Sequence, residues 1–167
     1  METDRLIVDA VRESDGEDYF NNISHDEKVL ETFMCRRVES LEDLDFPAFL
    51  ERYKDRETLF AIRLKETGRL IGILTLFDGD GGACEIGYGI GSRWWGRGYA
   101  TEAVARFIEY LFDERGFATV EASFFTGNDA SRRVMEKCGM TFSRFAEKDV
   151  FYLGADRDLT YYSISRP

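Results

Sequence analysis

The segment best suited to chemistry is the glycine-rich run Arg93–Thr101 (RWWGRGYAT). It follows an expected strand that ends near Ile90 and precedes an expected helix over 98–112. The first turn of a helix leaves its N–H groups unpaired and carries partial positive charge, and glycines let phosphate oxygens approach that backbone. Arg93 and Arg97 add full charges. The segment therefore predicts an anion site for a phosphate-bearing ligand, with a plain packing turn as the alternative.

Two known phosphate-binding patterns are incomplete or absent in this segment, which argues against the ligands they bind. The run GRGYAT over 96–101 has only the first two glycines of a dinucleotide-binding GxGxxG pattern, although Glu121 follows about twenty residues later. Too little chain follows for a doubly wound sheet. The GxxxxGKS or GxxxxGKT pattern of nucleotide-phosphate loops is absent. A dinucleotide-dependent oxidoreductase is therefore a weak alternative.

A second candidate is the carboxylate of Glu85, in the run ACEIGYGI over 83–90. Side chains alternate along a strand, so Glu85 shares a face with Gly87 and Gly89. Those glycines leave the face bare, which gives another molecule room to approach the carboxylate. The simpler interpretation is a solvated glutamate near a strand end. Cys84 lies on the opposite face with no histidine nearby in sequence, so it is a poor candidate for an acyl relay.

Periodicity and turn chemistry predict the elements that must position these residues. The helix over 98–112 has the clearest pattern, with apolar residues on one side and polar residues opposite. The order of elements predicts a single α+β domain over 1–167 around one mixed sheet. Strands are expected over 5–11, 58–64, 70–77, 83–90, 119–125, 149–153 and 159–164, helices over 15–22, 26–35, 41–53, 98–112 and 129–138, and turns at 66–69, 78–82 and 154–158. Ser24 is the expected cap of the second helix.

Composition excludes several classes of protein. The 167 residues are 44% hydrophobic and 32% charged, which is typical of globular proteins. The three cysteines are widely spaced, so we expect reduced thiols rather than disulfides or a zinc site. With His25 as the only histidine, we expect no metal. No apolar run reaches the about 18 residues of a membrane span, and the acidic start METDRL is unlike a signal peptide, which predicts a cytoplasmic protein.

The net charge of −10 lies in the first half of the chain. Residues 1–92 contain 11 basic and 21 acidic residues, whereas 93–137 contain 7 of each and 138–167 contain 4 of each. Such a field repels nucleic acid and anionic lipid, so neither is an expected partner. It favours a cationic ligand near the first half, although solubility is an equally good explanation.

Four motifs, in order along the chain, resemble the GCN5-related N-acetyltransferases, the GNAT family. RWWGRG over 93–98 fits the signature Q/R-x-x-G-x-G/A, and the following YATEA is similar to the subgroup of the ribosomal-protein N-terminal acetyltransferases RimJ and RimL. TDRLIV over 3–8 resembles the first strand of that subgroup, and EIGYGI over 85–90 its central strand. NDASRRVMEKCGM over 128–140 resembles its N-x-x-S helix. The resemblance spans nearly the whole chain.

The resemblance implies a GNAT fold, a twisted, mostly antiparallel mixed sheet of about seven strands flanked by helices. Acetyl-CoA would lie in a cleft between the splayed fourth and fifth strands. Backbone N–H groups over 95–100, with the Thr101 hydroxyl, would hold the pyrophosphate, and the strand edge over 88–90 would pair with the pantetheine arm. Asn128 would bind that arm, unless it only caps its helix. The implied cofactor-binding residues are Tyr88, Ile90, Arg93, Trp95, Gly96, Arg97, Gly98, Tyr99, Ala100, Thr101, Asn128 and Ser131.

Acetyl transfer needs a neutral amine, a polarised thioester carbonyl and a proton for the departing thiolate. A peptide α-amine, with a pKa of about 7.7–8.0, is partly neutral at physiological pH. We expect Glu85 to take the amine proton, directly or through water, and a backbone N–H of its strand to polarise the carbonyl. Ser131 would lie near the sulfur. Met135 stands where many GNAT members have a proton-donating tyrosine, so Ser131 or water would have to protonate the thiolate.

The sequence leaves the acceptor open. It is expected to be a protein or peptide N-terminal α-amine or a small amine, such as a polyamine, an amino acid or an aminoglycoside. A non-catalytic acetyl-CoA-binding sensor is the alternative function, best supported by Met135. Relatives often dimerise, which implies a possible homodimer. The residues Trp94, Trp95, Tyr99, Phe124 and Phe125 could line an acceptor groove, although such aromatic residues more often form a core.

Overall fold

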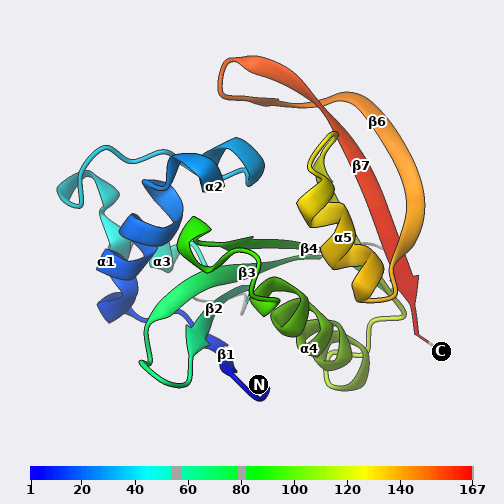
Figure 1. Ribbon diagram of the computed structural model, residues 1–167, viewed down its shortest axis with the longest axis horizontal. Helices are drawn as coiled ribbons and strands as arrows, with labels where there is room; N and C mark the ends of the chain where they lie inside the picture. Colours follow the sequence, from blue (N-terminus) through cyan, green and yellow to red (C-terminus); the bar gives the residue numbers. More distant parts are fainter. Residues whose placement is uncertain (54–57, 79–81, 167) are drawn as a thin grey trace.

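Figure 1 shows a computed structural model of the chain, in which residues 1–53, 58–78 and 82–166 are described. Its strands form one sheet in the order β1-β2-β3-β4-β5-β7-β6. Neighbouring strands are antiparallel except β4 and β5, which run parallel. The expected mixed, mostly antiparallel sheet is therefore confirmed. The strands are β1 (Leu6–Ala10), β2 (Leu59–Leu64), β3 (Leu70–Asp78), β4 (Ala83–Ile90), β5 (Thr119–Phe125), β6 (Thr141–Tyr152) and β7 (Ala155–Ser165).

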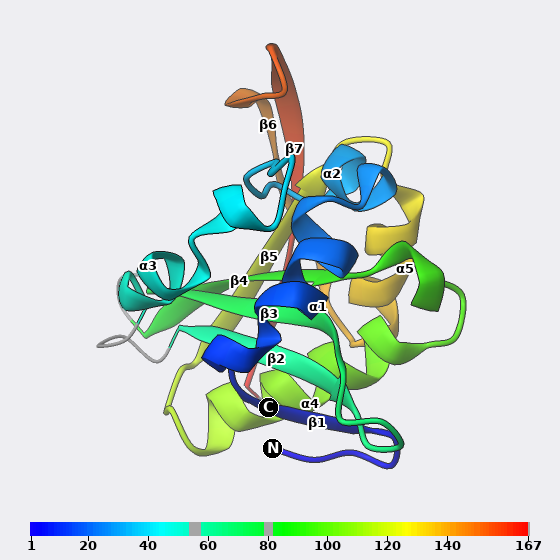
Figure 2. The ribbon, with the colours of Figure 1, turned by 90° about the vertical axis from the view of Figure 1, so that its left-hand side faces the viewer.

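Helices cover both faces of this sheet (Figure 2). The short helices α1 to α3 pack on one face, and the longer α4 and α5 pack on the other. No described helix is both long enough and apolar enough to cross a membrane. The helices are α1 (Gly16–Tyr19), α2 (Glu27–Thr32), α3 (Phe46–Glu51), α4 (Tyr99–Asp113) and α5 (Asp129–Lys137), with short helical turns at Glu13–Asp15, Phe20–Ser24, Glu42–Leu44 and Ser92–Trp94.

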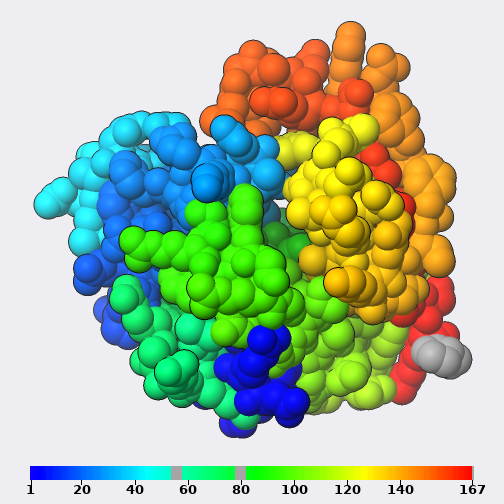
Figure 3. Space-filling view, in the orientation of Figure 1, coloured from blue at the N-terminus to red at the C-terminus, as the bar shows by residue number. Residues whose placement is uncertain are grey.

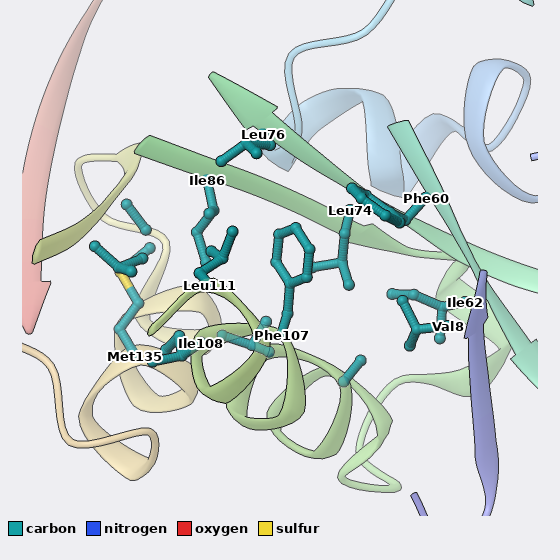
Figure 4. Packing of buried hydrophobic residues seen from close by; sticks show 14 of the residues in the cluster. Val8, Phe60, Ile62, Leu74, Leu76, Ile86, Phe107, Ile108, Leu111 and Met135 are labelled. Carbon is teal, nitrogen blue, oxygen red and sulfur yellow. The ribbon is translucent and has the colours of Figure 1, made fainter. Parts of the chain in front are cut away.

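The larger core lies between the sheet and α4 (Figure 4). The apolar side of α4 that the spacing predicts is fully buried, including Val104, Phe107 and Leu111. The Phe107 ring packs against Phe60 of β2 with ring centroids 5.1 Å apart. Burying a large apolar side chain is worth about 1.5–3 kcal/mol. This packing therefore fixes where the first turn of α4 lies relative to β4.

The second core, beneath α1 to α3, contains a buried ion pair. Arg63 of β2 donates to both carboxylate oxygens of Asp15, at 2.5 and 2.7 Å, and to Asp9 at 2.7 Å. Burial by itself raises the pKa of Asp15, but the hydrogen bonds from Arg63 and from the Arg12 backbone outweigh it and hold the pKa below its usual value. The pair anchors the first helical turn to the sheet.

Two expected helices differ from those observed. The helix expected over 41–53 begins only at Phe46, because Asp45 before it has a left-handed backbone (φ 39°). The helix expected over 26–35 spans only Glu27–Thr32. Its cap is Asp26, whose carboxylate accepts from two first-turn N–H groups, so the expected Ser24 cap is wrong.

The last hairpin, β6–β7, is longer than expected. The expected strands over 149–153 and 159–164 are only parts of β6 and β7, and the turn lies at 153–154 rather than 154–158. Polar and charged side chains on its exposed face obscure the alternation that identifies strands. The expected strands over 83–90 and 119–125 match β4 and β5. The expected turn at 78–82 lies largely outside the described residues.

Candidate active site

The sheet opens between β4 and β5, as expected. Their pairing runs from Ala83 beside Thr119 to Ile86 beside Ala122 and stops there, although both strands continue. Two pockets open along the gap, which we call the α4 pocket and the Glu85 pocket after residues that line each. Figure 3 shows a hollow between α2 (blue), the β4–α4 segment (green) and α5 (yellow), beneath the β6–β7 hairpin (orange to red). Both pockets are lined by Thr32, Phe33, Tyr88 and Ser131, so they meet at the middle of β4.

The α4 pocket, of about 380 Å³, presents bare backbone at the start of α4. Gly98 precedes the helix with a left-handed φ of 81° and provides no side-chain cap. No hydrogen bond among the described residues uses the N–H groups over 96–101. The helix dipole adds partial positive charge there. Of the expected cofactor-binding residues, Tyr88, Ile90, Trp95, Gly96, Gly98, Tyr99, Ala100, Thr101, Asn128 and Ser131 line this pocket.

The loop before α4 is held by Arg5, which the sequence did not single out. Its Nη1 donates to the Arg97 carbonyl at 3.0 Å, and its Nε donates to Glu102 at 2.7 Å. Its guanidinium lies 4.5 Å from the centroid of the Tyr99 ring. Glu102 also accepts from the Thr3 hydroxyl at 2.5 Å. The N-terminal segment therefore fixes the shape of the loop from outside the pocket.

The Trp95 N–H is less available than expected. It donates to the Ser92 carbonyl at 3.3 Å, and the Trp95 indole donates to the Ile90 carbonyl at 2.6 Å. These bonds close the turn between β4 and α4. The open N–H groups therefore begin at Gly96.

The cations at the α4 pocket are not those expected. Arg93 and Arg97 are exposed and do not line it. Arg133 and Lys137 of α5 do line it, and their spacing of four residues places them on one helix face. That spacing after the N-x-x-S start is the signal that would have identified them.

Three polar side chains meet at the junction of the two pockets. Asn128 caps α5, since its Oδ1 accepts from the Ser131 N–H at 3.2 Å, and it also lines the α4 pocket. The Ser131 Oγ lies 2.6 Å from the Tyr88 hydroxyl, and either oxygen can donate. Burial raises the pKa of Tyr88, so its phenol keeps its proton at neutral pH. Met135 is fully buried in the core and lines neither pocket, so the phenol at this junction comes from β4 instead.

The Glu85 pocket, of about 410 Å³, opens on the α2 side of the sheet. Glu85 is half-buried and accepts a hydrogen bond from the Ser123 hydroxyl at 2.8 Å. Burial raises the pKa of Glu85, and the charges of Glu121 and Asp149 raise it further, against the lowering effects of Ser123 and Arg144. A carboxylate with a raised pKa is better matched to proton abstraction near neutral pH.

The sequence predicts an open face of β4 at Gly87 and Gly89, but in the structure this face is covered. The Phe33 ring lies over it, and a Cβ added at Gly89 would stand 3.0 Å from that ring. A Cβ at Gly87 would meet both Phe33 and Phe77. The two glycines therefore make room for an aromatic ring of the chain itself, at the boundary between the two pockets.

The tip of the β6–β7 hairpin reaches across to the α2 side of the molecule (Figure 1). The Tyr152 hydroxyl, at the end of β6, donates to the carbonyls of Phe33 and Cys35, at 3.1 and 3.2 Å. Its ring stacks on Phe125, with centroids 5.3 Å apart. We call these contacts the Tyr152 latch. The aromatic residues that line the pocket are Tyr19, Phe33, Phe49, Tyr53, Phe77, Phe124 and Phe125, whereas Trp94, Trp95 and Tyr99 line the α4 pocket.

A sheet that splays between two parallel strands, with a bare helix start on one side and a carboxylate pocket on the other, defines an acyltransferase of the GNAT class. Comparison with known proteins agrees. The family model described as "Acetyltransferase (GNAT) domain" matches residues 5–141, so the chain belongs to the GNAT acetyltransferase family. It is an acetyl-CoA-dependent N-acetyltransferase.

Individual proteins match over nearly the whole chain. The uncharacterized N-acetyltransferase YoaA of Bacillus subtilis (strain 168) is 29% identical over 172 residues, which cover 100% of this chain and 97% of that protein. The ribosomal-protein-S5-alanine acetyltransferase of Vibrio fischeri shares the fold with a TM-score of 0.82 and 20% identity, over 99% of this chain and 95% of that one. The spermidine N-acetyltransferase of Vibrio cholerae, in complex with CoA and spermine, does so with a TM-score of 0.82 and 17% identity, over 98% and 96%.

Proposed function

We propose that the protein transfers the acetyl group of acetyl-CoA to a primary amine in the Glu85 pocket, by direct attack in a ternary complex in the cytoplasm. The acceptor is a peptide N-terminal α-amine or a small-molecule amine. The supporting observation is that the two pockets share Tyr88 and Ser131, so donor and acceptor entering from opposite sides reach one point. The related fold serves a ribosomal-protein acetyltransferase and a spermidine acetyltransferase, so the fold alone does not choose between acceptors.

The α4 pocket is the proposed acetyl-CoA site. Its open N–H groups over 96–101 suit the pyrophosphate oxygens, because a helix start favours anions. Arg133 and Lys137 add positive charge beside them. The side-chain N–H₂ of Asn128 points to a pantetheine carbonyl as partner, since its oxygen is already used in the cap. The unpaired edge of β4 over 87–90 offers further backbone groups to that arm.

Glu85 is the proposed general base. It accepts the proton of the amine, directly or through one water, as the nitrogen attacks the thioester carbonyl carbon. Its half-buried position and raised pKa favour this role. A β4 backbone N–H polarises the carbonyl oxygen.

The Tyr88–Ser131 pair is the proposed proton source for the thiolate. As the C–S bond breaks, Ser131 donates its hydroxyl proton to sulfur and receives the proton of Tyr88, 2.6 Å away. The resulting phenolate is strongly basic because of the raised pKa of Tyr88, so it takes a proton back from water. This pair supplies the phenol that Met135 does not. A candidate base and a candidate acid that both border the junction support catalysis over a non-catalytic sensor.

The test uses isotopically labelled acetyl-CoA with a pool of peptides and small amines, read by mass shifts and by release of free CoA thiol. We expect wild-type protein to label an amine. Ser131→Ala and Tyr88→Phe should each still bind acetyl-CoA and lose at least about tenfold in kcat, a larger factor than any loss of affinity. Binding of acetyl-CoA without label on any amine would overturn the proposed reaction, and no binding would overturn the assignment of the α4 pocket.

A further inference from the structure

The acidic first half of the chain does not make the Glu85 pocket acidic. Several acids of residues 13–45 are already engaged elsewhere. Asp15 pairs with Arg63, Asp18 with Arg69, and the Asp26 carboxylate caps α2. Within that range only Asp45 lines the pocket. The net charge of the chain therefore says little about the acceptor.

The charges that do line the described part of the pocket balance each other. Glu85 and Asp45 are negative, and Arg36 and Arg52 are positive. No ion pair joins either arginine to another residue that the structure describes. An acceptor with one amine can place it at Glu85. A polyamine could place a second cation near Asp45, but Arg36 and Arg52 oppose it and any further cation, whereas a monoamine needs Glu85 alone.

The remaining wall is apolar and partly uncovered. Phe77 lies directly opposite Glu85 in the β3–β4 ladder and is 52% exposed. Met34, after α2, lines the same pocket and is 54% exposed. The rings of Phe33 and Phe125 are half-buried along it. Apolar side chains left open around one carboxylate are what an amine attached to a large apolar group would cover.

We infer that the acceptor is a monoamine with an aromatic or bulky aliphatic group close to its amine carbon. This inference rests on the proposed function and names the substrate class of that site. The amine lies at Glu85, and the apolar group lies against Phe77 and beneath the Phe125–Tyr152 stack. The same chemistry comes from two sources, a small arylalkylamine or a peptide whose first residue is large and apolar. The volume of about 410 Å³ falls in the usual range for small-ligand pockets.

The first experiment measures kcat/KM by thiol release for four acceptors at fixed acetyl-CoA. They are 2-phenylethylamine, a short peptide beginning with phenylalanine, the same peptide beginning with serine, and spermidine. We expect at least one phenyl compound to exceed both serine peptide and spermidine by at least about tenfold, the scale of an apolar group in a matching pocket. Which phenyl compound is better identifies the source.

The outcomes separate the inference from the proposed function. A higher kcat/KM for spermidine or for the serine peptide would overturn the inference and leave the acetyltransferase proposal standing. Transfer to none of the four, in protein that binds acetyl-CoA and transfers to none of a broader amine pool, would overturn the proposed function and this inference with it.

A matched pair of variants tests the same point within the pocket. Phe77→Glu places a further carboxylate beside Glu85, whereas Phe145→Glu makes the same change at an equally exposed position, also 52%, on β6 outside both pockets. Phe77→Glu should lower kcat/KM for the phenyl acceptor at least about tenfold and raise the ratio for spermidine over that acceptor. Phe145→Glu should change neither, and both should bind acetyl-CoA like wild type. Equal changes in the two variants, or none in Phe77→Glu, would contradict the inference.

Discussion

The two pockets that meet at Tyr88 are built from different parts of the polypeptide. The α4 pocket offers open main-chain N–H groups over 96–101 beside side chains of α5, whereas the Glu85 pocket is lined by side chains from both halves of the chain. Main-chain groups are present whatever the side chain at their position. A surface of side chains changes with each substitution. If the proposed roles hold, the donor half depends more on the backbone and the acceptor half more on the residues particular to this protein.

The substitution Glu85→Gln should have the largest effect, and it should affect the Glu85 pocket without affecting the α4 pocket. This change removes the proposed base and keeps the shape of the side chain, so kcat should fall about 10²- to 10⁴-fold while acetyl-CoA affinity stays the same. Glu85 acts only when deprotonated, so wild-type activity rises as pH passes through its raised pKa. In the variant that rise should disappear, leaving only the rise due to the amine. A pH profile of kcat/KM with calorimetric binding measures both.

The control is Glu121→Gln, the carboxylate beside Glu85 on β5. It should keep most of the rate and keep the rise with pH, but with its midpoint at lower pH, because the charge of Glu121 no longer raises the pKa of Glu85. Comparable losses in the two variants would mean that neither carboxylate acts as a specific base.

Asp15→Asn should weaken the side of the molecule that carries the acceptor pocket. It leaves Arg63 buried with one partner fewer, which costs about 3 kcal/mol in the free energy of unfolding at pH 7. The pKa of Asp15 is lowered in the folded state, so its contribution is full above the ordinary pKa of about 3.9 and is lost as pH falls below it. Urea unfolding at pH 7 and near pH 3 should show a large difference from wild type that shrinks in acid.

The pair Asp18–Arg69 is less buried and provides the comparison, with the side chain of Arg69 56% exposed and that of Asp18 17% exposed. Asp18→Asn should change stability by no more than about 1 kcal/mol. A loss as large as that of Asp15→Asn would show that burial of the ion pair is not what matters.

Gly98→Ala should affect the donor half alone. Alanine at φ 81° is strained, and relief of that strain moves the first N–H groups of α4, so the Kd for acetyl-CoA should rise about tenfold. Gly68→Ala carries the same strain at φ 70°, in the β2–β3 turn outside both pockets. Calorimetry should show loss of acetyl-CoA affinity only in the first variant, and equal losses would contradict the assignment of the helix start.

Tyr152→Phe should give the smallest effect and confine it to the acceptor. It removes a hydroxyl that holds the carbonyls of Phe33 and Cys35, worth about 1 kcal/mol, so the acceptor KM should rise about fivefold. Acetyl-CoA affinity should not change. Tyr110→Phe on α4, outside both pockets, is the control, and steady-state kinetics with each substrate varied is the measurement.

The sequence predicted the features of the site that depend on neighbouring residues and missed those that depend on distant ones. The bare helix start over 96–101, the position of Glu85 on β4 and the Asn128 cap rest on neighbouring residues, so local patterns indicated them. Arg93 and Arg97 do not line the α4 pocket as expected, because the direction of a side chain in a loop cannot be predicted from the sequence. The placement of Phe33 over Gly89 depends on contacts between distant segments, and so does the pairing of Tyr88 with Ser131.

The Tyr152 latch also has a consequence for how the protein folds. It joins carbonyls at 33 and 35 to a hydroxyl more than a hundred residues later, and the entropy lost on closing so long a loop must be recovered by the contacts made there. The turn before α4, by contrast, is closed by bonds between residues only a few positions apart. As the chain folds, we therefore expect the turn before α4 to form early and the latch to form late. The contacts that Tyr152 adds beside the Glu85 pocket would then be among the last parts of the molecule to be completed.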